Sequence, residues 1–174
     1  MVTASEFRQA MGRFATGLTV VTVRTPEGIR GMTANAFASV SLDPPLVLVC
    51  VEQTSHTHRR LERSGSMGVN VLTRQQRALS RRFAGGCPSG GDAFEGIETE
   101  EGPHGTVLIA GSLASLSCRV VRIDPAGDHS IFLGEVVQAR LGQGEPLVYY
   151  RGELGRFRPN APLDLLPYWV EEAL

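Results

Sequence analysis

The sequence predicts a mainly β protein organised as an antiparallel barrel or sandwich. About six or seven apolar, β-rich segments follow one another along the chain, separated by short turns, while helical patterns are few and local. A parallel nucleotide-binding sheet is disfavoured, because no strand leads into a GxGxxG sequence and a helix, and the P-loop pattern is absent too.

Length and composition indicate one domain over residues 1–174. The chain has 174 residues and no Ser- or Pro-rich linker, and a domain of this size buries roughly 70% of its unfolded surface. A net charge of −1 gives no excess that favours nucleic acid or an anionic membrane. The three cysteines, Cys50, Cys87 and Cys118, form no metal-ligand pair and no disulfide framework. The N-terminus lacks a basic segment followed by an apolar one, so we expect a cytoplasmic protein.

The first element is an amphipathic helix. Thr3 and Glu6 have capping-box spacing, and the apolar face holds Phe7, Ala10, Met11 and Phe14, with Gly17 expected to end the helix. Two strands follow, Leu18–Val23 and a segment that ends near Thr33, joined by a turn at 26–28.

The central stretch Gly31–Val51 carries the first ligand signal. The small and polar residues Thr33, Ala34, Asn35 and Ala36 let a ligand approach the backbone and offer a hydroxyl and an amide to its polar edge. A turn at 41–45 contains two prolines, and Leu46–Val51 has the composition of a buried strand. The alternative is a β-hairpin with a polar bulge and no ligand.

A second ligand signal lies at 54–57, before the Arg-rich segment His58–Ser64. Free N–H groups and the helix dipole make a hydroxyl-rich helix start suitable for anions. Ser55 and Thr57 are therefore either simple N-caps or N-caps that also hold a phosphate.

The rest of the chain alternates strands with one helix. We expect strands at Met67–Leu72, Leu113–Ile123, Ser130–Leu141 and Pro146–Arg151, and a helix at Arg74–Ala84 with Leu79 and Phe83 inward. A turn is expected at 125–128. Residues 85–105 contain seven glycines and two prolines and predict a long surface loop, while residues 158–174 predict an irregular arm.

Seven ordered segments resemble the short-chain flavin reductases, the reductase components of two-component flavin monooxygenases. They are FRQAMGRFATGLTVVT (7–22), GMTANAFASVSLDPPLVLVCV (31–51), SHT (55–57), VNVLTRQQRALSRRFA (69–84), GSLASLSCRVV (111–121), GDHSIFLGEV (127–136) and PLVYYRGELGRF (146–157). The match covers about 7–157, and only the glycine-rich segment 85–105 departs from the family's pattern.

The resemblance implies a Greek-key split β-barrel of the FMN-binding type, which binds flavin at a homodimer interface. It implies an NAD(P)H:flavin oxidoreductase that passes a hydride from NADH or NADPH to FMN or FAD and supplies reduced flavin to a separate monooxygenase. By resemblance, residues 33–36 lie along the isoalloxazine, with Ser39, Cys50 and Val51 beside them. Ser55 and Thr57 match the phosphate turn, and the segment of Arg82, Phe83 and Ala84 matches the one that reaches the phosphate or ribityl chain.

His129 is the candidate for turnover. It follows Gly127 and Asp128 at a turn before a strand, and the family match implies a place near the nicotinamide, where an imidazole could orient the carboxamide or assist proton balance. His56, His58 and His104 receive no such support. Tyr149 or Tyr150 could contact the flavin, but alternation sends only one inward, and Tyr150 is the predicted contact.

Three functional classes stay open from the sequence: a reductase of diffusible flavin, an oxygenase that retains its flavin, and a flavin-binding protein without turnover. The resemblance favours the first.

Overall fold

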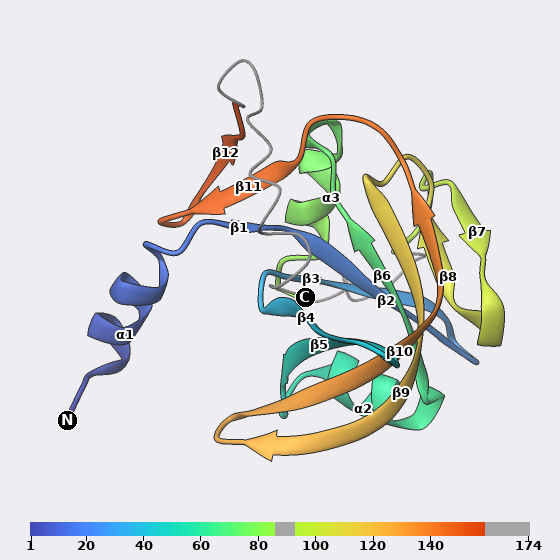
Figure 1. The fold of residues 1–174 in the computed structure, drawn as a ribbon, viewed down its shortest axis with the longest axis horizontal. Coiled ribbons are helices and arrows are strands. Elements are labelled where there is room, and N and C mark those ends of the chain that lie inside the picture. Colours follow the sequence, from blue (N-terminus) through green and yellow to red (C-terminus); the bar gives the residue numbers. More distant parts are fainter. Residues whose placement is uncertain (86–92, 159–174) are drawn as a thin grey trace.

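The computed structural model describes residues 1–85 and 93–158, and its main feature is one strongly curled antiparallel sheet of seven strands (Figure 1). In spatial order the strands are β3 (Gly28–Ala34), β2 (Thr19–Thr25), β6 (Ser66–Val71), β9 (Ala114–Ala126), β10 (His129–Leu141), β5 (Pro45–Glu52) and β4 (Phe37–Leu42). Among the described residues no ladder joins the two outermost strands, β3 and β4, so the curled sheet is split between them. The predicted mainly β, antiparallel fold is confirmed.

Smaller elements cover the ends of this sheet. A three-stranded sheet contains β1 (Thr16–Gly17), β11 (Leu147–Tyr150) and β12 (Glu153–Arg156), and a hairpin joins β7 (Thr99–Glu101) to β8 (Val107–Ile109). The helices are α1 (Ala4–Met11), α2 (His56–Ser64) and α3 (Arg77–Arg82), with short 3-10 turns η1 (Arg74–Gln76) and η2 (Pro103–Gly105). No helix in the described ranges is long and apolar enough to cross a membrane.

Two apolar clusters hold the fold together, one on each face of β2. Successive side chains of a strand point to opposite faces, so Val21 packs inside the curled sheet while Val20 packs beneath α3. Phe132 and Met67 belong to the inner cluster, and Phe83 belongs to the outer one. Both faces of β2 are therefore buried against apolar side chains.

Asn70 ties four strands together at the centre of the molecule. Its fully buried side chain donates to the Val20 carbonyl at 3.0 Å. Its Oδ1 accepts from the Ile109 N–H at 2.7 Å and from the Ser115 hydroxyl at 3.1 Å. Because a buried amide without partners is costly, this network fixes β6 against β2, β8 and β9.

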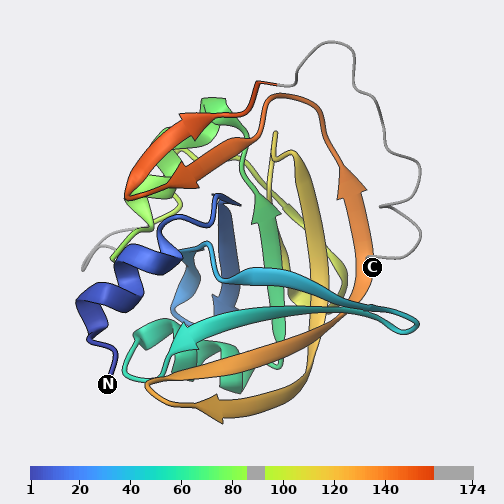
Figure 2. The same cartoon turned by 60° about the vertical axis from the view of Figure 1, so that its left-hand side comes forward.

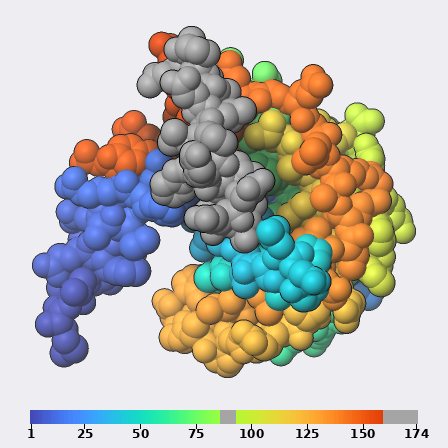
Figure 3. All heavy atoms as spheres, in the orientation of Figure 1, coloured from blue at the N-terminus to red at the C-terminus, as the bar shows by residue number. Residues whose placement is uncertain are grey.

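The first helix ends earlier than predicted and does not bury its apolar face. The capping box of Thr3 and Glu6 forms as expected, but the helix ends at Met11 with Gly12 as its C-cap, so the expected end at Gly17 is wrong. Residues 16–17 instead pair with β11. Phe7, Met11 and Phe14 are more than half exposed, and α1 stands away from the barrel (Figure 3).

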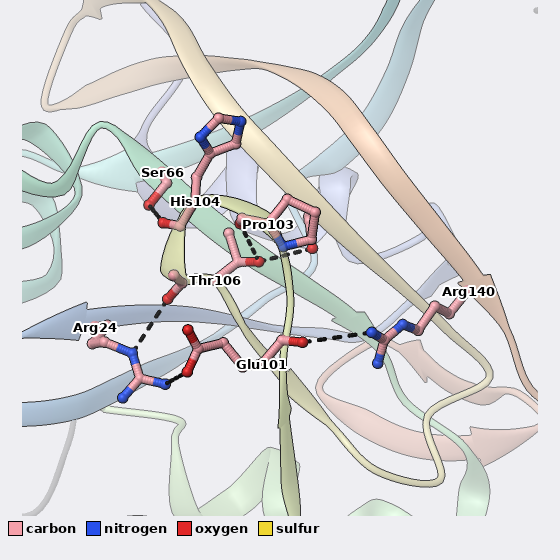
Figure 4. Close-up of polar contacts among 9 residues, drawn as sticks. Arg24, Ser66, Glu101, Pro103, His104, Thr106 and Arg140 are labelled. Atoms are coloured by element: carbon pink, nitrogen blue, oxygen red, sulfur yellow. Dashed lines mark hydrogen bonds and ion pairs between the residues drawn. The ribbon is translucent and has the colours of Figure 1, made fainter.

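The described part of 85–105 is not the surface loop that the sequence predicts. Ala93 and Phe94 are buried in the outer cluster. The hairpin β7–β8 is fastened on one side by Arg24, which contacts Glu101, and on the other by Arg140, which reaches the Glu101 carbonyl (Figure 4). Glycine content therefore misled the prediction, because two buried apolar residues and one strand pairing outweigh it. Residues 86–92 and the predicted arm from 159 onward lie outside the described residues.

Two further details differ from the sequence prediction. The central stretch contains an additional strand, β4, so it folds as β3 followed by a β4–β5 hairpin. Pro125 and Ala126 belong to β9, and the turn is confined to 127–128. Proline is tolerated there because β9 pairs with β6 only as far as Arg119, beyond which it has a free edge.

Candidate functional site

A groove of about 720 Å³ lies at the split between β3 and β4. We call it the rim groove; it is lined from β3, the link at 35–36, the end of β5, the start of α2, the segment after α3, and the first residue of β10. The end of β5, α2 and the tip of the β9–β10 hairpin lie together at one end of the barrel (Figure 2). Residues that are far apart in sequence therefore meet at the split between β3 and β4.

The floor of the rim groove is tied to α3 through Thr33. Its backbone N–H donates to the Phe83 carbonyl at 3.0 Å, and its hydroxyl donates to the Ser80 carbonyl at 2.7 Å. Since the hydroxyl's proton is committed, Thr33 can offer a ligand only its acceptor lone pairs. Phe83 is buried against Phe94, and a Cβ on Gly31 would lie 3.0 Å from the Phe83 ring, so a glycine is needed for this close packing.

One end of the rim groove is the start of α2. The Ser55 hydroxyl accepts from the His58 N–H at 3.1 Å, so Ser55 is the N-cap, whereas Thr57 lies inside the first turn and is buried. Half-buried Arg30 and Arg60 also line this end, together with the carboxylate of Glu52. A helix start with two guanidinium groups favours a phosphate, although Glu52 partly opposes it.

His129 lines the rim groove beside this same end, because it is the ladder partner of Glu52 at the end of β5. Its Nδ1 lies 2.7 Å from Oδ1 of Asp128, and its carbonyl accepts from Gln53 Nε2 at 2.9 Å. The hydrogen bond from His129 lowers the pKa of the Asp128 carboxyl below its ordinary value. The imidazole is therefore held at the groove through Nδ1, and in the part of the chain that the structure describes its second ring nitrogen, Nε2, has no hydrogen-bond partner.

Most of the residues predicted from the sequence meet in this one groove. Those that line it are Thr33, Ala34, Asn35, Ala36, Cys50, Ser55, Thr57, Phe83 and His129. Those that do not are Ser39, Val51, Arg82, Ala84 and Tyr150. Ser39 is exposed on β4, and Val51 is buried in the inner cluster because its side chain alternates away from Cys50.

The remaining three predicted residues point elsewhere. Arg82 donates to the Glu95 carbonyl at 3.1 Å, and Ala84 lines a second hollow that shares Thr33 and Asn35 with the rim groove. As alternation requires, the two tyrosines of β11 differ: Tyr149 lines this second hollow, whereas Tyr150 is exposed, and its contact with flavin stays a prediction.

Sequence reasoning missed Arg30, Met32, His56 and Arg60 at the rim groove, and Asp128 behind His129. His56 was set aside for lack of family support, yet it stands in the first turn of α2 beside the predicted phosphate turn. Its adjacency to Ser55 was a usable signal. No local pattern marks Arg30 or Met32. Which side chains of β3 face the groove depends on the register of its pairing with β2.

Comparison with known proteins places the chain in a family. The family model described as "Flavin reductase like domain" matches residues 11–158. The chain belongs to this family, and its curled sheet is the family's split barrel. Membership confirms the resemblance found in the sequence, together with the NAD(P)H-dependent flavin oxidoreductase activity and the flavin that it implies.

Individual relatives share the full domain. The chain is 44% identical over 151 residues to "FMN reductase (NADH) SmoA" of Agrobacterium fabrum, covering 87% of this chain and 84% of that protein. It is 40% identical over 155 residues to the reductase component of 4-nitrophenol 4-monooxygenase/4-nitrocatechol 2-monooxygenase of Rhodococcus opacus, covering 89% and 82%. The solved structure of the Streptomyces globisporus NADH:FAD oxidoreductase SgcE6 superposes with a TM-score of 0.85 at 41% identity, covering 91% and 98%.

Proposed function

We propose that the rim groove is where this chain binds flavin and where NADH reduces it. The observation that carries the proposal is the meeting of residues 33–36, the start of α2 and His129 in one groove, of a volume typical for small-ligand sites. Bound flavin would accept a hydride at its ring nitrogen N5 from C4 of the nicotinamide.

The chain's own residues suit three parts of such a ligand. Ala34, Ala36 and Cys50 are small, and the backbone bond from the Cys50 N–H to the Ala36 carbonyl, 3.0 Å long, holds this wall in place. A flat ring can therefore lie against the link at 35–36, with Thr33 accepting from its polar edge. Arg30 and Arg60 would neutralise the phosphate at the start of α2.

His129 would position the nicotinamide. Asp128 holds one ring nitrogen, so the other is directed to a polar group such as the carboxamide. Holding two rings within reach of each other accelerates transfer by orientation, without any covalent role for the protein.

A C2 homodimer is part of the proposal. The outer face of the sheet next to the rim groove carries the aliphatic row Leu46, Leu48, Ile131 and Leu133, all of them half-buried, and β10 pairs Ile131 with Cys50, which lines the groove. Exposed Val40 and Leu42 extend the apolar surface. A second copy on this face would wall the groove and cover apolar area that monomers seldom expose.

Two substitutions test the dimer. Leu48→Glu should give a monomer in sedimentation velocity at micromolar concentration and weaken flavin binding, because the groove loses a wall. Glu153→Gln on β12, away from this face, serves as the control. A wild-type monomer that is active as a reductase at that concentration would rule out the dimer as part of the site.

The product is proposed to serve a separate monooxygenase as diffusible reduced flavin, with the cytoplasmic location still a prediction. The test is NADH and NADPH consumption with FMN, FAD and riboflavin in turn. Steady oxidation of NADH that depends on added flavin supports the proposal. Flavin that stays bound and reacts with oxygen and an organic substrate would identify a flavin-retaining oxygenase, and absence of turnover would identify a binding protein.

A further inference from the structure

A third hollow, of about 420 Å³, continues from the rim groove between the β2–β3 turn and α2. We call it the arginine groove, because Arg24, Arg59, Arg60 and Arg63 line it. His56 and Arg60 line both grooves, so the two hollows meet at the start of α2, where the proposed flavin phosphate lies. Glu27 is its only acidic residue among the described residues.

This concentration of positive charge is unusual for the chain, which carries a net charge of −1. Arg63 suits the last turn of α2, where the helix dipole favours a cation, but the other charges do not help the helix to fold. The helix has no acidic residue in its first turn, and Arg59 lies near the positive end of the helix dipole. Arg59 and Arg63 are four residues apart, a spacing at which like charges on a helix repel. A bound anion would relieve both effects.

The arginines differ in how far they are already engaged. Arg24 is held by the Glu101 carboxylate and the Gly105 carbonyl (Figure 4), so it forms a fixed wall. Arg59 lies 2.9 Å from Nδ1 of His56. Within the ranges 1–85 and 93–158, Arg60 and Arg63 make no hydrogen bond or ion pair, although the charge of Arg60 helps to lower the pKa of Glu27. The N–H donors of both guanidinium groups are therefore available for an incoming anion.

We propose that the arginine groove binds the AMP half of FAD, and that it makes the enzyme prefer FAD to FMN. The inference rests on the proposed flavin site, because it takes the rim groove as the place of the ring. FMN ends at the phosphate at the start of α2, whereas FAD continues there with a second phosphate and an adenosine. Guanidinium groups bind phosphate oxygens through paired N–H donors, which is the chemistry that the arginine groove offers.

The experiment compares flavin affinities of the wild type, the double variant Arg59→Gln/Arg63→Gln and the control Arg156→Gln. Neither substituted arginine of the double variant lines the rim groove, and Arg156 lies on β12 outside both grooves. The expected result for the double variant is a rise of at least about tenfold in the Kd for FAD, with the Kd for FMN unchanged within about twofold. AMP alone should displace FAD from the wild type more effectively than it displaces FMN.

Added salt gives a second readout, since it screens charge: from 50 to 300 mM NaCl, wild-type affinity should fall more steeply for FAD than for FMN. Arg63→Gln alone is the substitute should the double variant fail to fold. Equal losses for both flavins, or none, would overturn the proposal. So would an unchanged Kd for FAD accompanied by a raised KM for NADPH but not NADH, because the groove would then bind the 2′-phosphate. FMN reduction by the wild type reports separately on the proposed function.

Discussion

Nδ1 of His129 lies 2.7 Å from Oδ1 of Asp128, at the tip of the β9–β10 hairpin. Asp128 is almost fully exposed, and His129 is 44% exposed, so the pair stands at the mouth of the rim groove and not in the core. The contact fixes which ring nitrogen can face a ligand. It thereby links two neighbours in sequence to the chemistry proposed for the groove.

Replacing His129 by Ala should separate catalysis from binding. If the imidazole contacts the nicotinamide and not the flavin, flavin affinity stays nearly intact, while flavin reduction slows by up to about 100-fold because the nicotinamide loses its orientation. Stopped-flow reduction of the flavin-loaded variant at several NADH concentrations measures this. Wild-type kinetics in the variant would remove His129 from the site.

Asp128→Asn keeps the size of the side chain and removes its charge. We expect reduction to slow by about tenfold with flavin affinity unchanged, because the ring is held less firmly. The hydrogen bond from His129 lowers the pKa of Asp128, so the carboxylate stays charged at neutral pH and gains a proton only below its ordinary value of 3.8. At pH 7 the wild type therefore carries this charge and the variant does not, so stopped-flow reduction of the two flavin-loaded proteins at that pH measures its effect. Equal rates would contradict a role for the Asp128 charge.

Asn35→Leu tests the link between β3 and β4. Asn35 is exposed at the junction of the rim groove and the second hollow, so the substitution removes a polar partner and adds bulk where a ring would approach. Loss of one such hydrogen bond corresponds to about 1–3 kcal/mol, so flavin affinity should fall roughly tenfold or more. Flavin titration by fluorescence checks this. Unchanged affinity in a folded variant would mean that Asn35 only shapes the turn.

Gly68→Ala should destabilise the fold, whereas Gly17→Ala should not. A Cβ on Gly68 would lie 2.2 Å from the Val107 carbonyl oxygen and 2.3 Å from the Thr22 hydroxyl, so β6 and β8 must separate. We expect a loss of about 2 kcal/mol or more in the free energy of unfolding. Gly17 has no atom within 4 Å of its Cβ position and should change stability by less than about 0.5 kcal/mol. Urea unfolding of both variants decides, and similar midpoints would contradict the packing argument.

Cys118 should make stability depend on alkaline pH. Burial raises the pKa of its thiol from 9.0 to about 12, so the folded state keeps a proton that the unfolded state loses. The contribution is complete below pH 9 and declines from about pH 9 toward about 12, by at most about 1.4 kcal/mol per pH unit. Urea unfolding from pH 8 to 10.5 should show a steeper decline for the wild type than for Cys118→Ala. Parallel declines would mean that another group dominates.

The sequence alone determined the local structure of this protein and the chemistry of its ligand. The capping box of Thr3 and Glu6, the N-cap Ser55 and the buried strand around Val49 follow from dihedral preferences and alternation, which act over a few residues. The ordered family motifs predicted flavin and nicotinamide as ligands, together with nine of the residues that line the rim groove. These features depend on neighbours in sequence or on whole motifs.

Only the tertiary structure decided which faces are buried and which distant residues meet. The amphipathic α1 lies exposed, Tyr149 and not Tyr150 turns inward, and Arg30 and Arg60 join Ser55 at one end of the groove. Burial on either face of a strand gives the same alternating pattern, so a shift of one residue in register exchanges the inward and outward side chains. That register is set by ladder partners far away in the chain. Local sequence therefore cannot fix the register. The split between β3 and β4, and the groove that lies at this split, both follow from the register.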